Sequence, residues 1–331
     1  MLPLGTAPSP TPSVRETGHA RFRLTSVADN VARVTATHDR SGALRILHIS
    51  DTHLYGDGTL HYGIVDTTAA FDRVLAQASE IEGIDIVVLS GDLSDDGTLE
   101  SYRRLRDRIA PWASERGAEV VYAMGNHDLP DAFDEVLGDR RRVLELGGYR
   151  IVTLDSSVPG AAYGSISAEQ LAWLAEMLSE PAELGTVIVL HHPPTRAVTP
   201  LLRLLELDDP HALLNVLEGS DARIVLSGHY HHSLVTLERG IPVVVAPGVT
   251  NTSDVTAPSD VERATIGAGF ALIDLPASGA PRVSIVSAPS ERDGELVFEL
   301  DAAGIHRIAE AFGAPVAPVA PTLATEPPAA E

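Results

Sequence analysis

The chain has 331 residues, enough for one large domain or two small ones, and with 44% hydrophobic residues it can bury a sizeable core. Its 24 Lys and Arg stand against 46 Asp and Glu, and the net charge of −22 disfavours a nucleic-acid polymer as a partner. The absence of cysteine excludes disulfides, iron–sulfur clusters and thiol nucleophiles, and it fits a reducing compartment.

The start of the chain predicts little regular structure. Residues 1–18 are rich in Pro, Ser, Thr and Gly without a period, which predicts a disordered lead. They also lack the basic and apolar regions of a signal peptide. Between residues 20 and 37 the alternation of apolar side chains predicts two short strands around Asp29, forming an edge hairpin.

From residue 44 the pattern repeats as strand, loop and helix. Strands are expected at 44–50, 84–89 and 120–124, and helices at 67–80, 98–110 and 130–137. Because the links between these elements are short, the strands are expected to pair in parallel.

The second half adds hairpins to this pattern. Gly147-Gly148 predicts a turn between strands at 142–146 and 149–154, and Ser167 predicts the start of a helix at 167–178. Further strands are expected at 186–190, 223–226, 232–237, 241–246, 268–275 and 282–287, and helices at 211–217 and 302–312.

These elements indicate one α/β domain over residues 19–312, followed by a disordered Pro- and Ala-rich tail at 313–331. The simplest arrangement is a four-layer α-β-β-α sandwich with two mixed β-sheets. No apolar run approaches the ~18 residues that a membrane-spanning helix needs. We therefore expect a soluble, cytoplasmic protein.

Five of the apolar runs end in residues that can bind a metal. The motifs are Asp51-Thr52-His53, Gly91-Asp92-Leu93-Ser94-Asp95, Gly125-Asn126-His127-Asp128, His191-His192 and Gly228-His229-Tyr230-His231. The carboxyl ends of parallel strands are where open α/β folds place their sites. Mixed carboxylate and imidazole ligands suit Mn, Fe, Co or Zn, and two such ions need a shared anionic ligand. Asp92 is the residue we expect to bridge them.

Each motif taken singly also has a structural interpretation. Asp92 alone is compatible with a turn or a helix cap, and Gly125-Asn126 with a tight turn, because both residue types tolerate positive φ. His48, inside a strand, is predicted to be a packed, hydrogen-bonded histidine.

Together the five motifs resemble those of the calcineurin-like binuclear metallophosphoesterases, over residues 51–231. Segments 48–54, 62–66 and 154–160 are similar to the class III cyclic-nucleotide phosphodiesterase branch, which also contains glycerophosphodiesterase-type enzymes.

The resemblance implies a role for each residue of the motifs. The first metal would be held by Asp51, His53 and His231, the second by Asn126, His191 and His229, and both by Asp92. His127 would protonate the leaving group, with Asp95 orienting its ring and raising its pKa. Asn126 and His127 would also contact the substrate. His192 and His232 are expected to have structural roles.

The implied function is metal-dependent phosphodiester hydrolysis, foremost of a 3′,5′-cyclic nucleotide such as cAMP, by a hydroxide bridging two metal ions. Iron and manganese are the first choice of metal, with zinc or cobalt open. A glycerophosphodiesterase, a 2′,3′-cyclic-nucleotide phosphodiesterase and a non-catalytic binding scaffold remain alternatives, and a homodimer is also open.

Substrate walls are expected from the loops at 55–64, 159–164, 193–205 and 250–265. Within the first of them, Tyr62 is interpreted either as a platform for a base or as a packed aromatic residue.

Overall fold

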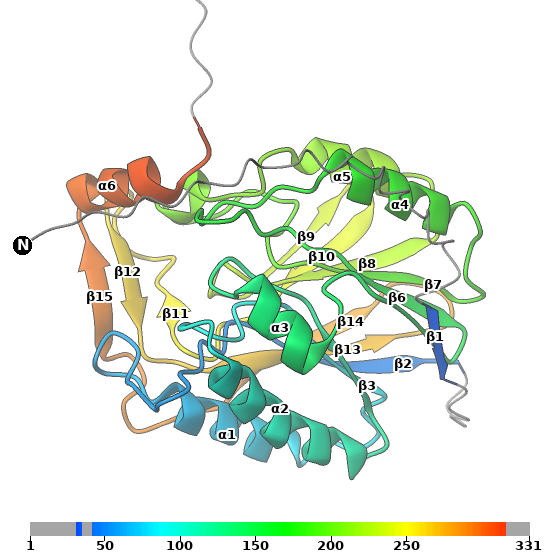
Figure 1. Cartoon of the computed structure of the whole chain (residues 1–331), viewed down its shortest axis with the longest axis horizontal. Coiled ribbons are helices and arrows are strands. Elements are labelled where there is room, and N and C mark those ends of the chain that lie inside the picture. The colour runs from blue at the N-terminus through cyan, green and yellow to red at the C-terminus, as the bar shows by residue number, and fades with distance from the viewer. Residues whose placement is uncertain (1–30, 35–41, 316–331) are drawn as a thin grey trace, which may run out of the picture.

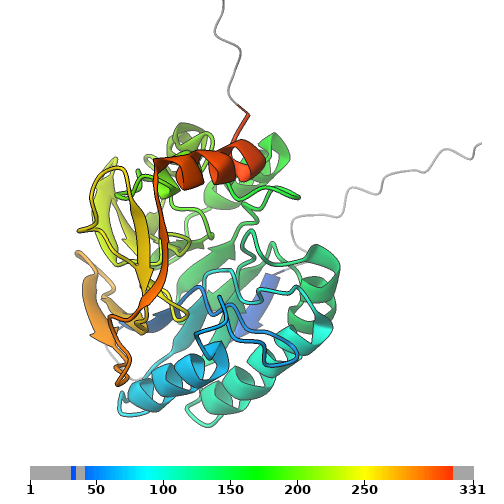
Figure 2. The ribbon, with the colours of Figure 1, turned by 90° about the vertical axis from the view of Figure 1, so that its left-hand side faces the viewer.

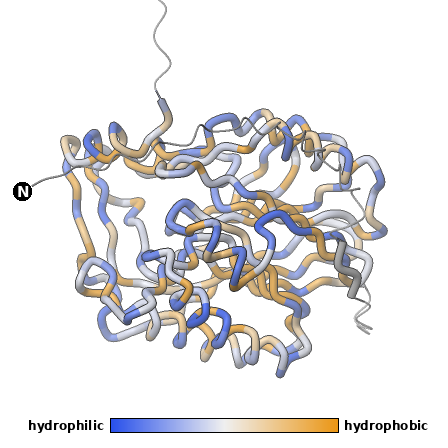
Figure 3. Tube along the Cα trace, in the orientation of Figure 1, coloured by the Kyte–Doolittle hydropathy of each residue, from blue (hydrophilic) through white to orange (hydrophobic). Residues whose placement is uncertain are grey.

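The structure is a computed structural model that describes residues 42–315 and the backbone of residues 31–34. Two β-sheets lie face to face between two layers of helices, as Figure 1 shows. The expected four-layer α/β sandwich is therefore confirmed. Figure 3 shows the hydrophobic residues gathered in the central strands, where the two sheets meet.

The larger sheet has seven strands in the order β1-β5-β6-β7-β8-β10-β9. Their bounds are β1 Val31–Val34, β5 Val143–Leu146, β6 Tyr149–Thr153, β7 Gly185–Val189, β8 Ala222–Ser227, β10 Ile241–Val245 and β9 Leu234–Glu238. The strands β6, β7, β8 and β10 run parallel, whereas β5–β6 and β9–β10 are antiparallel hairpins. The predicted hairpin at Gly147-Gly148 is confirmed, since Leu146 pairs with Tyr149.

The second sheet has five strands in the order β14-β13-β2-β3-β4. Their bounds are β14 Arg282–Ser287, β13 Gly269–Leu275, β2 Leu44–Ile49, β3 Ile86–Leu89 and β4 Glu119–Tyr122. The expected parallel pairing of β2, β3 and β4 is confirmed, and β13 adds an antiparallel neighbour. All four residues of β3 are buried, because helices cover one face and the other sheet covers the opposite face.

Helices cover the outer face of each sheet. The five-stranded sheet carries α1 Thr67–Ala78, α2 Leu99–Ser114 and α3 Pro130–Leu137, and the seven-stranded sheet carries α4 Ala168–Leu178 and α5 Pro210–Leu217. The expected end of α2 at residue 110 is wrong, since the helix continues through Pro111. Its buried face extends to Ala113, which offsets the one backbone hydrogen bond that the proline cannot donate.

A third, three-stranded sheet was not predicted. It contains β11 Thr252–Ser253, β12 Glu262–Thr265 and β15 Leu296–Leu300, all antiparallel, and β15 leads into the last helix, α6 Ala302–Phe312. Figures 1 and 2 show this sheet and α6 at one end of the sandwich. The segment 250–265 was expected to be a loop because its strands are short and one of them, β12, is half charged.

The edge hairpin expected between residues 20 and 37 stays a prediction. Its second strand agrees with β1, which pairs in parallel with β5 at the edge of the larger sheet. The other predicted strand of that hairpin lies outside the described residues, as do the predicted lead at 1–18 and all but three residues of the predicted tail. Within residues 42–315, no helix has the length and apolar character that crossing a membrane requires.

Candidate active site

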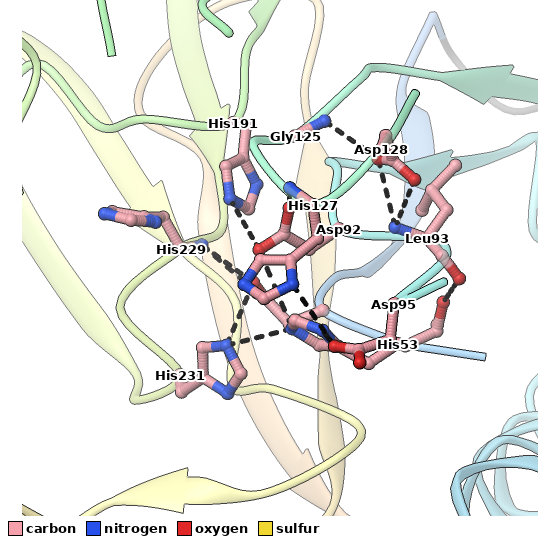
Figure 4. Close-up of polar contacts among 12 residues, drawn as sticks. His53, Asp92, Leu93, Asp95, Gly125, His127, Asp128, His191, His229 and His231 are labelled. Atoms are coloured by element: carbon pink, nitrogen blue, oxygen red, sulfur yellow. Dashed lines mark hydrogen bonds and ion pairs between the residues drawn. The ribbon is translucent and has the colours of Figure 1, made fainter. Parts of the chain in front are cut away.

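The predicted ligands meet where the carboxyl ends of strands from both sheets come together. Asp51 and His53 follow β2, Asp92 follows β3, Asn126 and His127 follow β4, His191 follows β7, and His229 and His231 follow β8. Figure 4 shows six of them, His53, Asp92, His127, His191, His229 and His231, brought together from separate loops. Ligand atoms of Asp51, His53, Asp92 and His231 lie within 4.8 Å of one another.

Asp92 occupies the centre of this group. Its Oδ2 lies 3.6 Å from Nε2 of His53 and 3.3 Å from Nε2 of His191, so one oxygen faces both halves of the cluster. Its Oδ1 accepts a hydrogen bond of 2.9 Å from the backbone N–H of His127. Burial acts to raise the pKa of Asp92, but the charges of His191 and His127 hold it well below its usual range. An ionised oxygen between two sets of imidazoles is the geometry that a bridging ligand requires.

The first set of predicted ligands forms a compact cage. Nε2 of His231 lies 3.3 Å from Oδ1 of Asp51 and 3.3 Å from Nε2 of His53. All three side chains are largely buried, and two imidazole nitrogens face each other beside a carboxylate. A cation of intermediate hardness fits this donor set, because it would accept both nitrogen lone pairs and offset the carboxylate charge.

The second set contains buried polar atoms with few or no partners. Within the described chain, Oδ1 of Asn126 has no hydrogen-bond partner, and Nε2 of His191 has only the contact with Oδ2 of Asp92 at 3.3 Å. The rings of His191 and His229 lie 5.1 Å apart between centroids. Leaving a buried acceptor unpaired costs about 1–3 kcal/mol, which a metal bound to these atoms would offset. The residues present therefore fit a second ion.

Each of the four predicted histidine ligands is oriented by a hydrogen bond through its other ring nitrogen. The bonds join His53 Nδ1 to Asp95 Oδ1 (2.9 Å), His191 Nδ1 to Ser90 O (2.9 Å), His229 Nε2 to Leu205 O (2.9 Å) and His231 Nδ1 to Asn251 Oδ1 (3.0 Å). Since every partner is an oxygen acceptor, each ring donates its N–H there, which leaves the second nitrogen to bind a metal through its lone pair once that nitrogen carries no proton.

Five of the predicted ligands have backbones in the left-handed region. The φ angles are 55° for Asp51, 43° for His53, 49° for Asp92, 69° for His229 and 51° for His231. Non-glycine residues pay of order 1–3 kcal/mol for this conformation, and they concentrate at functional sites. The loops also approach closely: a Cβ on Gly125 would lie 2.2 Å from Oδ1 of Asp92, which explains the glycine in that motif.

Asp128 connects two of the ligand-bearing loops. Its buried carboxylate accepts hydrogen bonds from the backbone N–H groups of Leu93 (3.1 Å), Ser94 (2.9 Å) and Gly125 (2.9 Å), as Figure 4 shows in part. The loop after β3 is thereby held against the loop after β4. Sequence reasoning placed Asp128 in a motif but gave it no role.

Asp128→Ala is expected to lower the free energy of unfolding by roughly 3 kcal/mol or more, because three buried N–H groups lose their acceptor. Urea denaturation of the metal-stripped protein measures this loss. The matched control is Asp131→Ala, which removes an exposed carboxylate three residues along the chain. Equal stability of the two variants would contradict the connecting role of Asp128.

His127 and Asp95 lie in contact, as predicted. Nδ1 of His127 is 3.2 Å from Oδ1 of Asp95, and the His127 side chain is 44% exposed at the mouth of the site. Although burial lowers the pKa of this imidazole, Asp92 and Asp95 together raise it to about 9. Asp95 also accepts hydrogen bonds from His53 and from the hydroxyl of Tyr55, so it is shared between a predicted metal ligand and the predicted proton donor.

A cavity of about 430 Å³ opens beside the cluster. It reaches from the predicted ligands to a largely apolar wall, and all four loops expected to form substrate walls contribute to it. Tyr62 lines it with a side chain that is mostly exposed, and its ring centroid lies 5.0 Å from that of Phe298. Phe298 on β15 and Ile308 and Phe312 on α6 were not predicted, because they follow the last motif by more than sixty residues.

Other histidines near the site have structural contacts. The two ring nitrogens of His192 contact Ser156 Oγ (2.9 Å) and the Ala162 carbonyl (3.2 Å), which agrees with its expected structural role. His48 is buried and contacts Ser90 Oγ at 2.8 Å. His61 was missed: it lies buried, with Nδ1 3.5 Å from Oδ1 of Asp95. Its sequence neighbours carry no ligand pattern that could have identified it.

Comparisons with known proteins agree with this geometry. A cAMP/cGMP dual specificity phosphodiesterase of Mycobacterium tuberculosis is 42% identical over 232 residues, which cover 67% of this chain and 73% of that protein. The 3′,5′-cyclic adenosine monophosphate phosphodiesterase CpdA of Pseudomonas aeruginosa is 27% identical over 276 residues, or 82% and 98% of the two chains.

Among solved structures, the purple acid phosphatase PPD1 of yellow lupin seeds shares the fold, with a TM-score of 0.53 at 13% identity over 85% of this chain and 58% of that one. The family model described as calcineurin-like phosphoesterase matches residues 44–233, which contain all five motifs. This chain therefore belongs to the calcineurin-like phosphoesterase family.

Proposed function

We propose that this protein is a metal-dependent phosphodiesterase that hydrolyses 3′,5′-cyclic nucleotides, with cAMP as its main substrate. The observation that carries the proposal is the position of Asp92 Oδ2, 3.6 Å from His53 and 3.3 Å from His191, beside a cavity of nucleotide size. The relatives described above are named as phosphodiesterases of cAMP or of both cAMP and cGMP, which supports the same substrate class.

Two metal ions are the cofactors we propose. One would be held by Asp51, His53 and His231, the other by Asn126, His191 and His229, with Asp92 shared. When bound, such a pair lowers the pKa of water and neutralises charge on a phosphoryl group. Iron and manganese are our first choice, and zinc or cobalt would accept the same donors.

The chain's own residues would position the substrate and supply a proton. The reaction forms one bond from phosphorus to a water oxygen and breaks the bond from phosphorus to the leaving ester oxygen. Since Nδ1 of His127 faces Asp95, its Nε2 is free to donate a proton to that leaving oxygen. Asp95 keeps the imidazole charged and oriented. The side-chain amide of Asn126, which lines the cavity, would contact a phosphoryl oxygen.

The lining of the cavity also favours a cyclic nucleotide over a glycerophosphodiester. This lining contains Tyr62, Phe298 and Phe312, with three leucines, and offers a nucleobase a large apolar surface that glycerol could not use. A non-catalytic scaffold is disfavoured because every predicted ligand is present. All of them but Asn126 lie in two clusters, and Asn126 lines the same cavity. The expected homodimer and cytoplasmic location stay predictions.

A substrate panel tests the proposal. We expect the manganese-loaded protein to hydrolyse cAMP with a kcat/KM at least tenfold above those for 2′,3′-cAMP and for a glycerophosphodiester. Bis(p-nitrophenyl) phosphate would report general phosphodiesterase activity. Hydrolysis of the bis ester without hydrolysis of any cyclic nucleotide would contradict the proposed substrate class, and no metal-dependent hydrolysis at all would favour the scaffold.

Removing the metals is expected to destabilise the protein as well as inactivate it. Ligands that bind only the folded state stabilise it by RT ln(1 + [L]/Kd), about 2.7 kcal/mol at a hundred times Kd. Adding Mn²⁺ to chelator-stripped protein should therefore raise Tm measurably and bind about two ions per chain. Ca²⁺ is the control, because it prefers cages of oxygen ligands. An equal rise in Tm with Ca²⁺ would contradict an imidazole-rich metal site.

A further inference from the structure

A second carboxylate lines the cavity, far along the sequence from the metal-binding motifs. Glu262 on β12 is only 1% exposed, yet it contributes to the cavity wall. Of the described residues that line the cavity, only Asp92 and Glu262 carry carboxyl groups. Because Asp92 is accounted for by the metal cluster, Glu262 is the one acidic group of the cavity without a role in the mechanism above.

Glu262 lies on the same face of the small sheet as an aromatic residue of the cavity. In the pairing of β12 with β15, Glu262 is opposite Leu300 and Ala264 is opposite Phe298. Residues two apart on a strand share a face, and so do directly paired residues, which makes Glu262 and Phe298 diagonal neighbours. The Phe298 ring lies 5.0 Å from the ring of Tyr62. A carboxyl group therefore lies beside an aromatic pair in one cavity.

The charge of Glu262 is not offset by a cation. Its neighbour Arg263 lies on the opposite face of the strand, paired with Glu299 at 2.8 Å and Asp254 at 3.2 Å. Within the described residues, Glu262 forms no ion pair. Its Oε2 accepts a hydrogen bond from the backbone N–H of Leu201 at 2.9 Å, and the hydroxyl of Thr199 is a second neighbouring donor. Burial accordingly raises the pKa of this carboxyl.

A buried, unpaired carboxyl is costly unless something donates hydrogen bonds to it. A carboxylate has about four acceptor positions, so Leu201 and Thr199 still leave room for N–H donors entering from the cavity. The edge of a purine carries such donors, and its flat ring suits an aromatic pair. The phosphate of the same ligand would meanwhile lie at the metal cluster.

We propose that Glu262 recognises the purine of the cyclic nucleotide, accepting a hydrogen bond from the 6-amino group of adenine while the base stacks on Tyr62 and Phe298. The inference rests on the proposed function and adds a specificity-determining residue to it. Guanine offers its N1–H and 2-amino N–H to the same carboxylate, so both purines are candidates and cAMP is the one tested.

The experiment compares cAMP with the cyclic phosphate of purine riboside, which differs from cAMP by lacking the 6-amino group. For the wild-type protein we expect kcat/KM to fall by about ten- to a hundredfold on this change, as for the loss of a hydrogen bond to a charged group. For Glu262→Ala we expect the two substrates to be hydrolysed with kcat/KM values within about threefold of each other.

Two controls distinguish a role of Glu262 in purine recognition from a role in stabilising the fold. Glu299→Ala removes a carboxylate from the exposed face of the same small sheet and should retain the wild-type preference. Bis(p-nitrophenyl) phosphate has no purine, so Glu262→Ala should hydrolyse it at the wild-type rate. Glu262→Gln retains an oxygen for the Leu201 N–H, which keeps the test valid if the alanine variant does not fold.

The inference is overturned if the wild-type protein hydrolyses cAMP and its desamino analogue equally well. It is also overturned if Glu262→Gln lowers kcat/KM for cAMP, the analogue and the bis ester by the same factor, because that result indicates a structural role. Wild-type protein that hydrolyses the bis ester and no cyclic nucleotide would instead contradict the proposed function itself.

Discussion

Replacing Asp92 by asparagine is expected to lower kcat for cAMP by roughly a thousandfold or more. The variant keeps the Oδ1 that accepts the N–H of His127 at 2.9 Å, but it removes the negative charge that lies 3.6 Å from His53 and 3.3 Å from His191. Two cations without a shared anion repel each other, and a loss of about 4 kcal/mol of transition-state stabilisation corresponds to a thousandfold in rate.

Metal analysis distinguishes loss of the bridging charge from misfolding as the cause of a lower kcat. Asp92→Asn should bind fewer than two ions per chain at metal concentrations that saturate the wild-type protein, with an unchanged far-UV spectrum. Asp57→Asn, which alters an exposed acid in a nearby loop, is the matched control and should bind two. Full occupancy of both sites in Asp92→Asn would contradict the bridging role.

Replacing His127 by alanine is expected to reduce kcat for cAMP by about 10²–10⁴-fold, the range typical of general acid catalysis. The alkoxide that leaves from cAMP needs a proton, and the ring whose Nδ1 lies 3.2 Å from Asp95 would supply it. p-Nitrophenolate leaves without protonation, so the same variant should lose much less activity on bis(p-nitrophenyl) phosphate. The measurement is the ratio of the loss in kcat for cAMP to the loss in kcat for bis(p-nitrophenyl) phosphate.

Metal content should stay at two ions in His127→Ala, since this side chain is not among the proposed ligands. His211→Ala removes an exposed histidine from α5 and should behave as the wild-type protein does. If His127→Ala hydrolysed cAMP at the full rate, or lost activity on both substrates by the same factor, another group would have to protonate the leaving oxygen.

Much of the sandwich follows from the sequence because its strands are buried and end in turn residues. The β3 strand is four buried aliphatic residues followed by Ser90-Gly91, a pattern that predicts a central parallel strand. The end of α2 was misjudged, because the burial of Ala113 depends on tertiary packing that the sequence around Pro111 does not show. The strands β11 and β12 were missed, because two and four partly polar residues carry no detectable period.

The residues of the site can likewise be divided into those that the sequence predicts and those that only the fold brings into place. Its proposed ligands lie in short motifs next to strand ends, so the sequence was sufficient to select them. Their supporting partners are set by the fold: Asn251 orients His231 from twenty residues away, and the Leu205 carbonyl orients His229 from twenty-four. The cavity wall at Phe298 and Phe312 likewise depends on where the last strand and helix pack. No local pattern encodes such long-range contacts.

The left-handed backbone of the proposed ligands has a consequence for engineering this protein. At Asp51, His229 or His231, glycine would relieve an unfavourable φ and also remove a metal-binding side chain. Arg239 has the same backbone conformation, with φ of 50°, but lies in the β9–β10 hairpin away from the cavity. In metal-stripped protein, a screen for heat resistance alone would reward glycine at either kind of position and so erode activity. A screen of metal-loaded protein, or one that also scores turnover, would retain the change only at Arg239, because glycine at a ligand also loses the stability that bound metal provides.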